Sequence, residues 1–432
     1  MKHLIKKIMQ KSIGYSHYKK NVSIMVLGRV VAQVVPILLT PLIARIYSPE
    51  EFGVFGVYST IVAIVSMVSS GRYCLTVILP KKRKTAEQLL MLASLITIIV
   101  TLTFFLLMVL SGGGLFKILN VEELNTYSLL MILDILFLGL YEPLYSFGLR
   151  QKKYKILSFN IIMQSLTVLV SRLLFGYFIN TGYGLLVSHL LGHSISYILL
   201  FFKLKVHRIN FGEKLVKLRV LAKKYIAFPR YSLPADILSM GANLSPNLFL
   251  NGLFGTVPTG YYSMSDKILG APLWLITSAI GDVFKQEAAQ SFREEGNCYK
   301  VFVKTAKTLF FLGIIPFILI FLFVPFLIPI LLGQDWTPVG DFIRILSIMY
   351  FAKFVVHPVS YVVYIIKKQR LNILFQSMRF LSLVGALLFG YYKNNLYSAL
   401  ISWSVLTTIS YILIFKISLE VTKNLQCVRF TQ

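Results

Sequence analysis

The feature that most constrains this chain is the length of its uncharged apolar runs. Leu89–Leu110 contains no charged residue. At about 1.5 Å per residue, a helix of this length crosses a hydrocarbon core about 30 Å thick. Similar runs recur along the whole chain, and in lipid each must be a helix because its backbone polar groups find no water there. The sequence therefore predicts an all-α integral membrane protein.

The composition supports the same class. Hydrophobic residues make up 56% of the 432 positions and charged residues only 14%, with a mean hydropathy of +0.73. A soluble domain carries about 25% charged residues. A net charge of +27 would suggest nucleic acid as the partner of a soluble protein. Here the basic residues lie in short gaps between apolar runs, so we predict membrane lipid as a partner and no nucleic acid.

Apolar runs bounded by charges and turn residues predict about twelve transmembrane helices. They are expected to form two pseudo-symmetric six-helix halves, residues 1–202 and 231–432, joined by a basic linker at residues 203–230. The predicted spans are 22–46, 53–79, 89–110, 124–149, 156–179, 182–202, 231–255, 259–284, 305–332, 339–366, 371–391 and 395–418.

Lysine and arginine fall on alternate sides of these spans. The N-terminal segment, residues 81–84 and the linker are basic, whereas Tyr47–Phe52 has only Glu50 and Glu51 as charged residues. Because basic loops stay in the cytoplasm, both termini are predicted to be cytoplasmic. The loops on the opposite side are short, which weighs against a membrane glycosyltransferase or a polymerase.

Motifs for catalysis or metal binding are missing from the sequence. Cys74, Cys298 and Cys427 lie far apart and form no metal-ligand spacing. His189 and His193 stand at i and i+4, but no acidic residue adjoins them, so we expect core or lumen histidines rather than metal ligands. No nucleophile–base pair or nucleotide-binding motif occurs. The sequence therefore predicts no enzyme, no cofactor and no metal.

A weak internal repeat relates the two predicted halves. Arg45–Val65 aligns with Gly252–Pro272 at an offset of 207, which pairs Gly53 with Gly260 and aromatic Phe55 with aromatic Tyr262. Parallel repeats of this kind are typical of transporters whose site lies between the halves. The repeat therefore favours a transporter over a static bundle.

Four segments carry a resemblance to a known family. They are TPLIARIYSPEEFGVFGVYSTI (40–61), SGRYCLTVILPKK (70–82), FPRYSLPADIL (228–238) and TGYYSMSDKILGAPLWLITSAIGDVF (259–284). They resemble the polysaccharide biosynthesis, or O-antigen (Wzx-type) flippase, family of the multidrug/oligosaccharidyl-lipid/polysaccharide flippase superfamily. Many relatives have an acid at the position of Cys74, so Arg72 is expected to lack an acidic partner there.

The resemblance implies a bacterial inner-membrane flippase that moves an undecaprenyl-diphosphate-linked oligosaccharide, an O-antigen or capsule unit, by alternating access. The implied partners are this lipid-linked substrate, membrane lipid, and a polysaccharide polymerase with its chain-length regulator. One alternative is a drug/cation antiporter of the same superfamily. Another, from a different class, is a membrane glycosyltransferase or O-antigen polymerase.

Charged residues inside the predicted spans are the candidate site residues, because a charge at mid-bilayer costs about 3 kcal/mol and therefore faces the bundle interior. Basic residues could bind the diphosphate through charge-assisted hydrogen bonds, or hold the bundle together as ion pairs. Acidic residues could couple transport to an ion, or simply neutralise a base. The basic set is Arg29, Arg72, Arg172, Lys267, Lys353 and Arg379, and the acidic set is Asp134, Glu142 and Asp266.

One opposite-charge pair follows from the repeat. At the offset of 207, Arg29 in the first span aligns with Asp236 in the seventh, at a similar depth near the cytoplasmic ends of the two helices. We predict that they form a gate that closes when the cavity faces outward. The alternative is that each residue neutralises a different neighbour.

Overall fold

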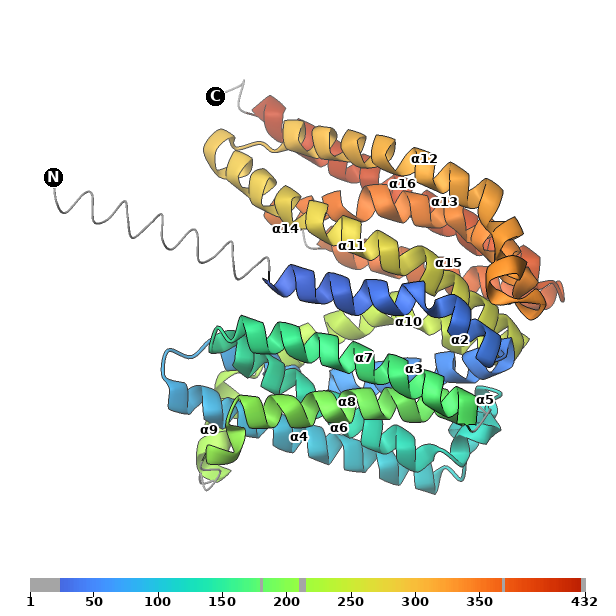
Figure 1. Ribbon diagram of the computed structural model, residues 1–432. Helices are drawn as coiled ribbons and strands as arrows, with labels where there is room; N and C mark the ends of the chain where they lie inside the picture. Colours follow the sequence, from blue (N-terminus) through green and yellow to red (C-terminus); the bar gives the residue numbers. More distant parts are fainter. Residues whose placement is uncertain (1–23, 179–181, 210–214, 367–369, 429–432) are drawn as a thin grey trace. The chain divides into compact units, whose positions relative to one another are not determined.

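The computed structural model describes residues 24–178, 182–209, 215–366 and 370–428 (Figure 1). Within these ranges the regular elements are all helices and no strand occurs. The prediction of an all-α membrane protein is confirmed. Residues 1–23, Asn180 and residues 210–214 of the linker lie outside the described residues.

Nine described helices are long and apolar enough to cross a membrane, or ten when a bent pair is counted as one span. That pair is Ile24–Leu38 and α2 (Thr40–Ile46), which meet at an angle of 44°. Pro41 has no N–H to donate, which interrupts the helical hydrogen bonds at this point. Two further helices, α10 and α13, have span length but carry several polar side chains.

The long helices of the N-terminal half are, besides that pair, α3 (Pro49–Ser69), α4 (Arg83–Leu110), α6 (Ser128–Arg150), α7 (Tyr154–Phe178) and α8 (Tyr183–Lys203). The C-terminal half contains α10 (Leu233–Phe254), α11 (Thr256–Glu295), α12 (Tyr299–Leu332), α13 (Thr337–Val359), α15 (Arg370–Tyr392) and α16 (Leu396–Val428). The short elements are η1 (Tyr73–Ile78), α5 (Gly114–Ile118), η2 (Glu122–Asn125), η3 (Val206–Arg208), α9 (Leu215–Lys224), η4 (Phe228–Ser232), η5 (Gln334–Trp336) and α14 (Val362–Ile365).

The predicted span 53–79 is wrong in its second part. Helix α3 ends at Ser69, and Gly71 and Arg72 then take left-handed conformations with φ of 53° and 60°. Two such residues in succession break a right-handed helix, and the 3₁₀ turn η1 follows. Arg72 therefore lies in a turn rather than inside a span. The predicted span 339–366 is likewise divided, because α13 ends at Val359.

Helices α11 and α12 are longer than their predicted spans, with 40 and 34 residues. At about 1.5 Å per residue, α11 is about 60 Å long, twice the thickness of the hydrocarbon core. Its C-terminal part, which contains Arg293 and Glu295, is the charged part. The hairpin between these two helices therefore extends beyond the membrane.

The chain falls into two compact units. The first comprises the described residues up to Leu39 together with Ile61–Leu115 and Glu123–Pro234. The second comprises Thr40–Thr60, Phe116–Glu122 and the described residues from Ala235 onward. Two pieces of the N-terminal half thus pack with the C-terminal helices, and α3 contributes one end to each unit.

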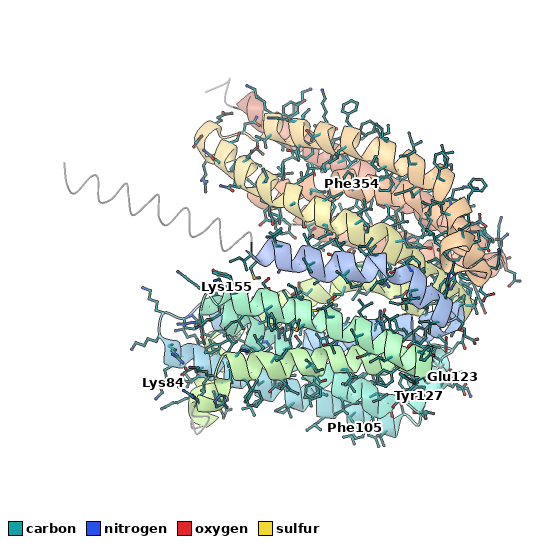
Figure 2. All side chains as sticks on the ribbon, in the orientation of Figure 1. Lys84, Phe105, Glu123, Tyr127, Lys155 and Phe354 are labelled. Carbon is teal, nitrogen blue, oxygen red and sulfur yellow. The ribbon has the colours of Figure 1, made fainter. Side chains whose placement is uncertain are left out.

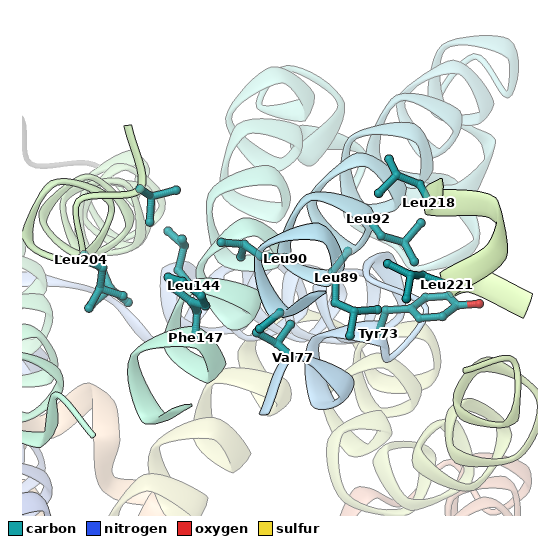
Figure 3. Close-up of a cluster of buried hydrophobic side chains, with 14 of the residues drawn as sticks. Tyr73, Val77, Leu89, Leu90, Leu92, Leu144, Phe147, Leu204, Leu218 and Leu221 are labelled. Carbon is teal, nitrogen blue, oxygen red and sulfur yellow. The ribbon is translucent and has the colours of Figure 1, made fainter. Parts of the chain in front are cut away.

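A cluster of buried side chains holds one end of the first unit together (Figure 3). Leu218 and Leu221 of α9 pack there against Leu89 and Leu92 of α4, and the Tyr73 hydroxyl donates to the carbonyl oxygen of Ala222 at 3.0 Å. The predicted basic linker therefore contains an anchored amphipathic helix. It buries Leu218 and Leu221 and leaves Lys217, Lys223 and Lys224 exposed.

In the second unit, α3 and α11 cross at glycines that the repeat pairs. A Cβ on Gly53 would lie 1.9 Å from the carbonyl oxygen of Thr256, and a Cβ on Gly260 would lie 1.8 Å from that of Pro49. The offset of 207 relates Pro49 to Thr256 just as it relates Gly53 to Gly260. The contact within the second unit is therefore reciprocal, with each glycine against the first residue of the other helix.

Two hydrogen bonds fix the same N-terminal pieces to the C-terminal helices. The Trp336 indole donates to the carbonyl oxygen of Ala44 at 2.8 Å, and the Asn120 amide donates to that of Gly252 at 2.9 Å. Trp336 is almost completely buried, so its N–H needs this partner. These bonds hold Thr40–Thr60 and Phe116–Glu122 within the second unit.

The ends of the first unit differ in charge. Figure 2 shows Lys84 and Lys155 at one end, and Glu123 and Tyr127 at the other.

The predicted orientation, with the basic end in the cytoplasm, can be tested with single cysteines and a membrane-impermeant maleimide. In cells with a permeabilised outer membrane, a cysteine at Glu50 should react with the maleimide, and a cysteine at Lys82 or Lys217 should not. The reverse labelling pattern would overturn the predicted orientation.

Two of the native cysteines should give little background in that experiment. Cys74 and Cys298 are both buried, and burial raises the pKa of the Cys298 thiol to about 11. The thiolate, which is the form that attacks maleimide, is therefore scarce at pH 7. The wild-type chain is the control that measures what remains.

Candidate functional site

The second unit contains a cavity with an empty volume of about 400 Å³, which includes space open to the outside. Side chains from α10, α11, α13, α15 and α16 form its walls. The charged and hydrogen-bonding groups that line it are Asn243, Tyr262, Asp266, Tyr350, Lys353, Arg379, Trp403, Thr407 and Tyr411.

Arg379 is the most buried cation of the cavity, with only 8% of the residue exposed. Its two terminal nitrogens donate to amide oxygens, to Gln376 at 3.0 Å and to Asn243 at 2.9 Å. The rings of Phe375 and Tyr411 lie 5.6 and 5.4 Å from its guanidinium carbon. No described carboxylate lies within 4.0 Å of it, so the charge is positioned by neutral groups alone.

Three donors at this cavity have no hydrogen-bond partner among the described residues. They are Nε of Arg379, the hydroxyl of Thr407 and the hydroxyl of Tyr411. Thr407 and Tyr411 are one helical turn apart on α16, so they lie on the same face. A buried polar group without a partner costs about 1–3 kcal/mol, and a ligand with acceptor atoms at the cavity would satisfy all three.

Lys353 is the second cation of the cavity. Its Nζ lies 5.1 Å from the ring centre of Tyr350, which orients the ammonium by a cation–π contact. The Tyr350 hydroxyl donates in turn to the carboxylate of Asp266. The cavity thus presents two cations and one carboxylate, and the carboxylate already accepts a hydrogen bond. Its balance of charge favours an anionic ligand.

Lys267 belongs to the same unit but does not line the cavity. Its Nζ lies 6.0 Å from the ring centre of Phe52 on α3. Of the six predicted cations, the structure therefore brings two, Lys353 and Arg379, to one cavity. The other three lie in the first unit.

Two of these three contact residues of α6. The Arg29 guanidinium donates to the Tyr145 hydroxyl at 3.4 Å. Arg72 lies 3.9 Å from the carboxylate of Glu142, and the Cys74 thiol donates to the same carboxylate at 3.5 Å. Position 74 holds no acid, as expected, and an acid distant in sequence, Glu142, lies beside Arg72 instead.

The third, Arg172 on α7, lies beside a buried cluster. The carboxylate of Asp134 on α6 is fully buried between two imidazoles of α8, with its oxygens 2.6 Å from Nδ1 of His189 and 2.6 Å from Nδ1 of His193. The two rings are edge-to-face, with centres 4.4 Å apart. Arg172 is close enough to act electrostatically on His189.

The sequence gives no direct sign of this cluster, because Asp134 precedes His189 by 55 positions. The ligand atoms of the three residues lie within 4.8 Å of one another, as those of a metal site can. Donors around a tetrahedral zinc ion, however, are about 3.3 Å apart, whereas the nitrogen–oxygen separations here are 2.6 Å. These are the distances of charge-assisted hydrogen bonds, so the imidazole N–H groups hold the carboxylate.

The remaining predicted residue, Asp236, lies in the first turn of α10 in the second unit. Its predicted pairing with Arg29 of the first unit stays a prediction. Among the predicted coupling residues, Asp134 and Glu142 have the basic partners described above, and Asp266 accepts from Tyr350. Their role in coupling likewise stays a prediction.

The fold is similar to that of solved transporters. A multidrug resistance MATE family transporter of the MOP superfamily, inward-facing, is 14% identical with a TM-score of 0.69, covering 92% of this chain and 99% of that one. The inward closed conformation of the lipid II flippase MurJ gives the same identity and TM-score, covering 93% and 91%. A MOP superfamily transporter from Pyrococcus furiosus is 13% identical with a TM-score of 0.61, covering 94% and 96%.

At these identities the similarity shows the fold, which is that of MOP superfamily transporters. No curated protein gives a significant match to the chain. Residues 42–341, well over half of the sequence, match a family described as polysaccharide biosynthesis protein. The chain belongs to the polysaccharide biosynthesis protein family.

Proposed function

We propose that the protein is a flippase that moves an oligosaccharide linked to a lipid diphosphate across the bacterial inner membrane. The observation that carries this proposal is the cavity of the second unit, in which Arg379 and Lys353 present positive charge and no described carboxylate neutralises Arg379. The family is one of polysaccharide biosynthesis, and a flippase for lipid II has the same fold.

A diphosphate is the part of such a substrate that resists transfer through hydrocarbon. Its hydration must be replaced by partners of opposite charge, because an unpaired ion in a medium of low dielectric constant costs far more than a paired one. A guanidinium and an ammonium at one cavity supply such partners through charge-assisted hydrogen bonds. The sugar part can remain in water-filled space.

The proposed cycle is alternating access between the two halves, with both termini in the cytoplasm. Asp134, Glu142 and Asp266 are the candidates for coupling it to an ion, and Arg29 with Asp236 is the candidate gate. A polymerase and its chain-length regulator would take the flipped substrate. The type of polysaccharide, O-antigen or capsule, is set by the sugar rather than by these residues.

Reconstitution tests the proposal. The purified chain in proteoliposomes should let a fluorescent undecaprenyl-diphosphate-linked oligosaccharide reach the opposite leaflet, where a membrane-impermeant quencher detects it. Protein-free liposomes and a chain with Lys353→Ala are the controls. Transfer no faster than in protein-free liposomes would exclude the flippase.

The alternative of a drug/cation antiporter rests on one observation, the carboxylate of Asp266 at the cavity wall. MATE transporters share the fold. The same proteoliposomes, loaded with a cationic dye under a proton or sodium gradient, distinguish the two. Dye efflux without transfer of the lipid-linked oligosaccharide would establish the antiporter.

Loss of the cavity's ammonium should stop export in cells. Lys353→Ala is expected to reduce polysaccharide export at least tenfold with normal protein abundance, because the diphosphate loses one of its two cations. Lys393→Ala is the matched control: Lys393 also lies over an aromatic ring, at 4.9 Å, but is exposed in the turn after α15. Equal export by the two variants would contradict a role of Lys353 in binding.

Arg172→Ala tests whether the first unit also contributes a cation to the substrate path. We expect the same loss of export, and only partial recovery with Arg172→Lys, because an ammonium cannot make the bidentate contact of a guanidinium. Protein abundance on immunoblots controls for folding. Full recovery with lysine would show that a point charge is sufficient.

A charge swap tests the predicted gate. Arg29→Asp and Asp236→Arg should each abolish export, because each places two like charges at the proposed gate. The double variant should regain a substantial part of it. A double variant no more active than the single ones would remove the gate and leave each residue with its own neighbour.

A further inference from the structure

The three donors without partners at the cavity of the second unit have a common chemical preference. Nε of Arg379, the Thr407 hydroxyl and the Tyr411 hydroxyl are all buried, and each can donate one hydrogen bond. A ligand oxygen that accepts several hydrogen bonds and carries negative charge satisfies all of them. In a diphosphate that joins a lipid to a sugar, each phosphate has two such oxygens.

The guanidinium of Arg379 is prepared for an anion by the groups that hold it. Its terminal nitrogens are occupied by the amide oxygens of Asn243 and Gln376, and two aromatic rings flank it. These contacts fix its plane without cancelling its charge, since amides and rings are neutral. Only Nε is left without a bond, on a side chain that lines the cavity.

We propose that Arg379, Thr407 and Tyr411 form a subsite for one phosphate group, and that Asn243 and Gln376 keep its guanidinium charged by holding it with neutral oxygens. Arg379, Thr407 and Tyr411 are binding residues, while Asn243 and Gln376 are positioning residues. The subsite rests on the proposed function, because it supplies the part of the cavity that receives the lipid diphosphate.

The proposed subsite predicts that removal of either hydroxyl weakens ligand binding without lowering stability. In the absence of ligand, each is a buried donor without a partner, so Tyr411→Phe or Thr407→Val should leave the unfolding temperature unchanged or raise it. The same changes should weaken binding of inorganic pyrophosphate about fivefold each, because the bound anion loses one hydrogen bond. A hydroxyl with a purely structural role would lower stability when removed.

The amides can be tested by changes that preserve shape. Asn243→Asp and Gln376→Glu place a carboxylate on the guanidinium, and we expect each to weaken pyrophosphate binding at least tenfold, as much as Arg379→Gln does. Asn243→Ala removes the same hydrogen bond without adding charge, and the loss should be only a few-fold. The matched control is Asn394→Asp, which adds the same charge in the exposed turn between α15 and α16.

The experiment is calorimetric titration of inorganic pyrophosphate into the full chain, held in nanodiscs of zwitterionic lipid at constant ionic strength. Pyrophosphate binding that Asn243→Asp and Arg379→Gln weaken alike, and that Asn394→Asp leaves unchanged, supports the subsite. Equal affinity of the wild type and Asn243→Asp, or of the wild type and Arg379→Gln, overturns it.

This outcome is separable from that of the proposed function. If the wild type flips the oligosaccharide lipid but does not bind pyrophosphate, the subsite is wrong and the flippase stands. If pyrophosphate binds with the expected variant pattern but no lipid is flipped, the subsite stands and the flippase is wrong.

Discussion

Alanine in place of Gly260 is expected to destabilise the protein by about 3 kcal/mol or more. The added methyl carbon would lie 1.8 Å from the carbonyl oxygen of Pro49, and a backbone atom cannot move aside as a flexible side chain can. Helices α3 and α11 would have to separate. Gly53→Ala should have an equal effect, because its methyl carbon would lie 1.9 Å from the carbonyl oxygen of Thr256. Thermal unfolding of the purified variants in detergent measures the change.

A third glycine provides the control for that experiment. Gly385 lies within helix α15, and a Cβ there would have no heavy atom within 4 Å. Gly385→Ala should therefore be neutral or stabilise by up to about 1 kcal/mol, since alanine is the better helix former. If Gly260→Ala unfolds at the same temperature as Gly385→Ala, the close crossing of α3 and α11 is wrong.

Removal of the buried carboxylate in the first unit should have an effect of similar size. Asp134→Ala leaves two imidazole N–H groups without their acceptors in a site where the carboxylate is fully buried. Breaking such a buried pair costs about 3–5 kcal/mol. We expect a correspondingly lower unfolding temperature and a loss of export through reduced abundance.

Asp134→Asn separates the two contributions to that loss. The amide keeps one oxygen as acceptor for one histidine and presents an N–H₂ group to the other, so its destabilisation should be smaller than that of alanine. A stable Asp134→Asn variant that no longer exports would assign the carboxylate a role in transport beyond holding the helices together. An Asp134→Ala variant as stable as the wild type would contradict the cluster itself.

The positions of the membrane-spanning helices were predictable from sequence because they depend on properties of each segment alone. The length and apolar character of a run such as Leu89–Leu110 are sufficient to identify it as a membrane span. Each predicted span contains a helix. The ends of spans were less predictable. The end of α3 depends on the left-handed residues Gly71 and Arg72, and the chain on either side of them is apolar enough for a continuous helix.

The charged groups of the cavity were predictable as candidates, but their arrangement around one cavity was not. A charged residue inside a predicted span is a candidate site residue, because a charge in lipid is costly. This criterion selected Lys353 and Arg379. The uncharged residues of the cavity could not be found, because Asn243 and Thr407 are ordinary residues of apolar helices and lie far from Arg379 in sequence. For the same reason His189 and His193 gave no sign of the carboxylate that joins them.

The contacts of Thr40–Thr60 and Phe116–Glu122 set an order on the biogenesis of the protein. These segments are synthesised early, yet their partners are the backbone of Thr256, the Gly252 carbonyl oxygen and the Trp336 indole. None of these exists until the ribosome has passed the middle of the chain. The first helices must therefore remain in the bilayer with one face unpacked until the C-terminal half has been synthesised. An N-terminal half made alone would keep that face open to lipid or to the membrane's quality-control proteases.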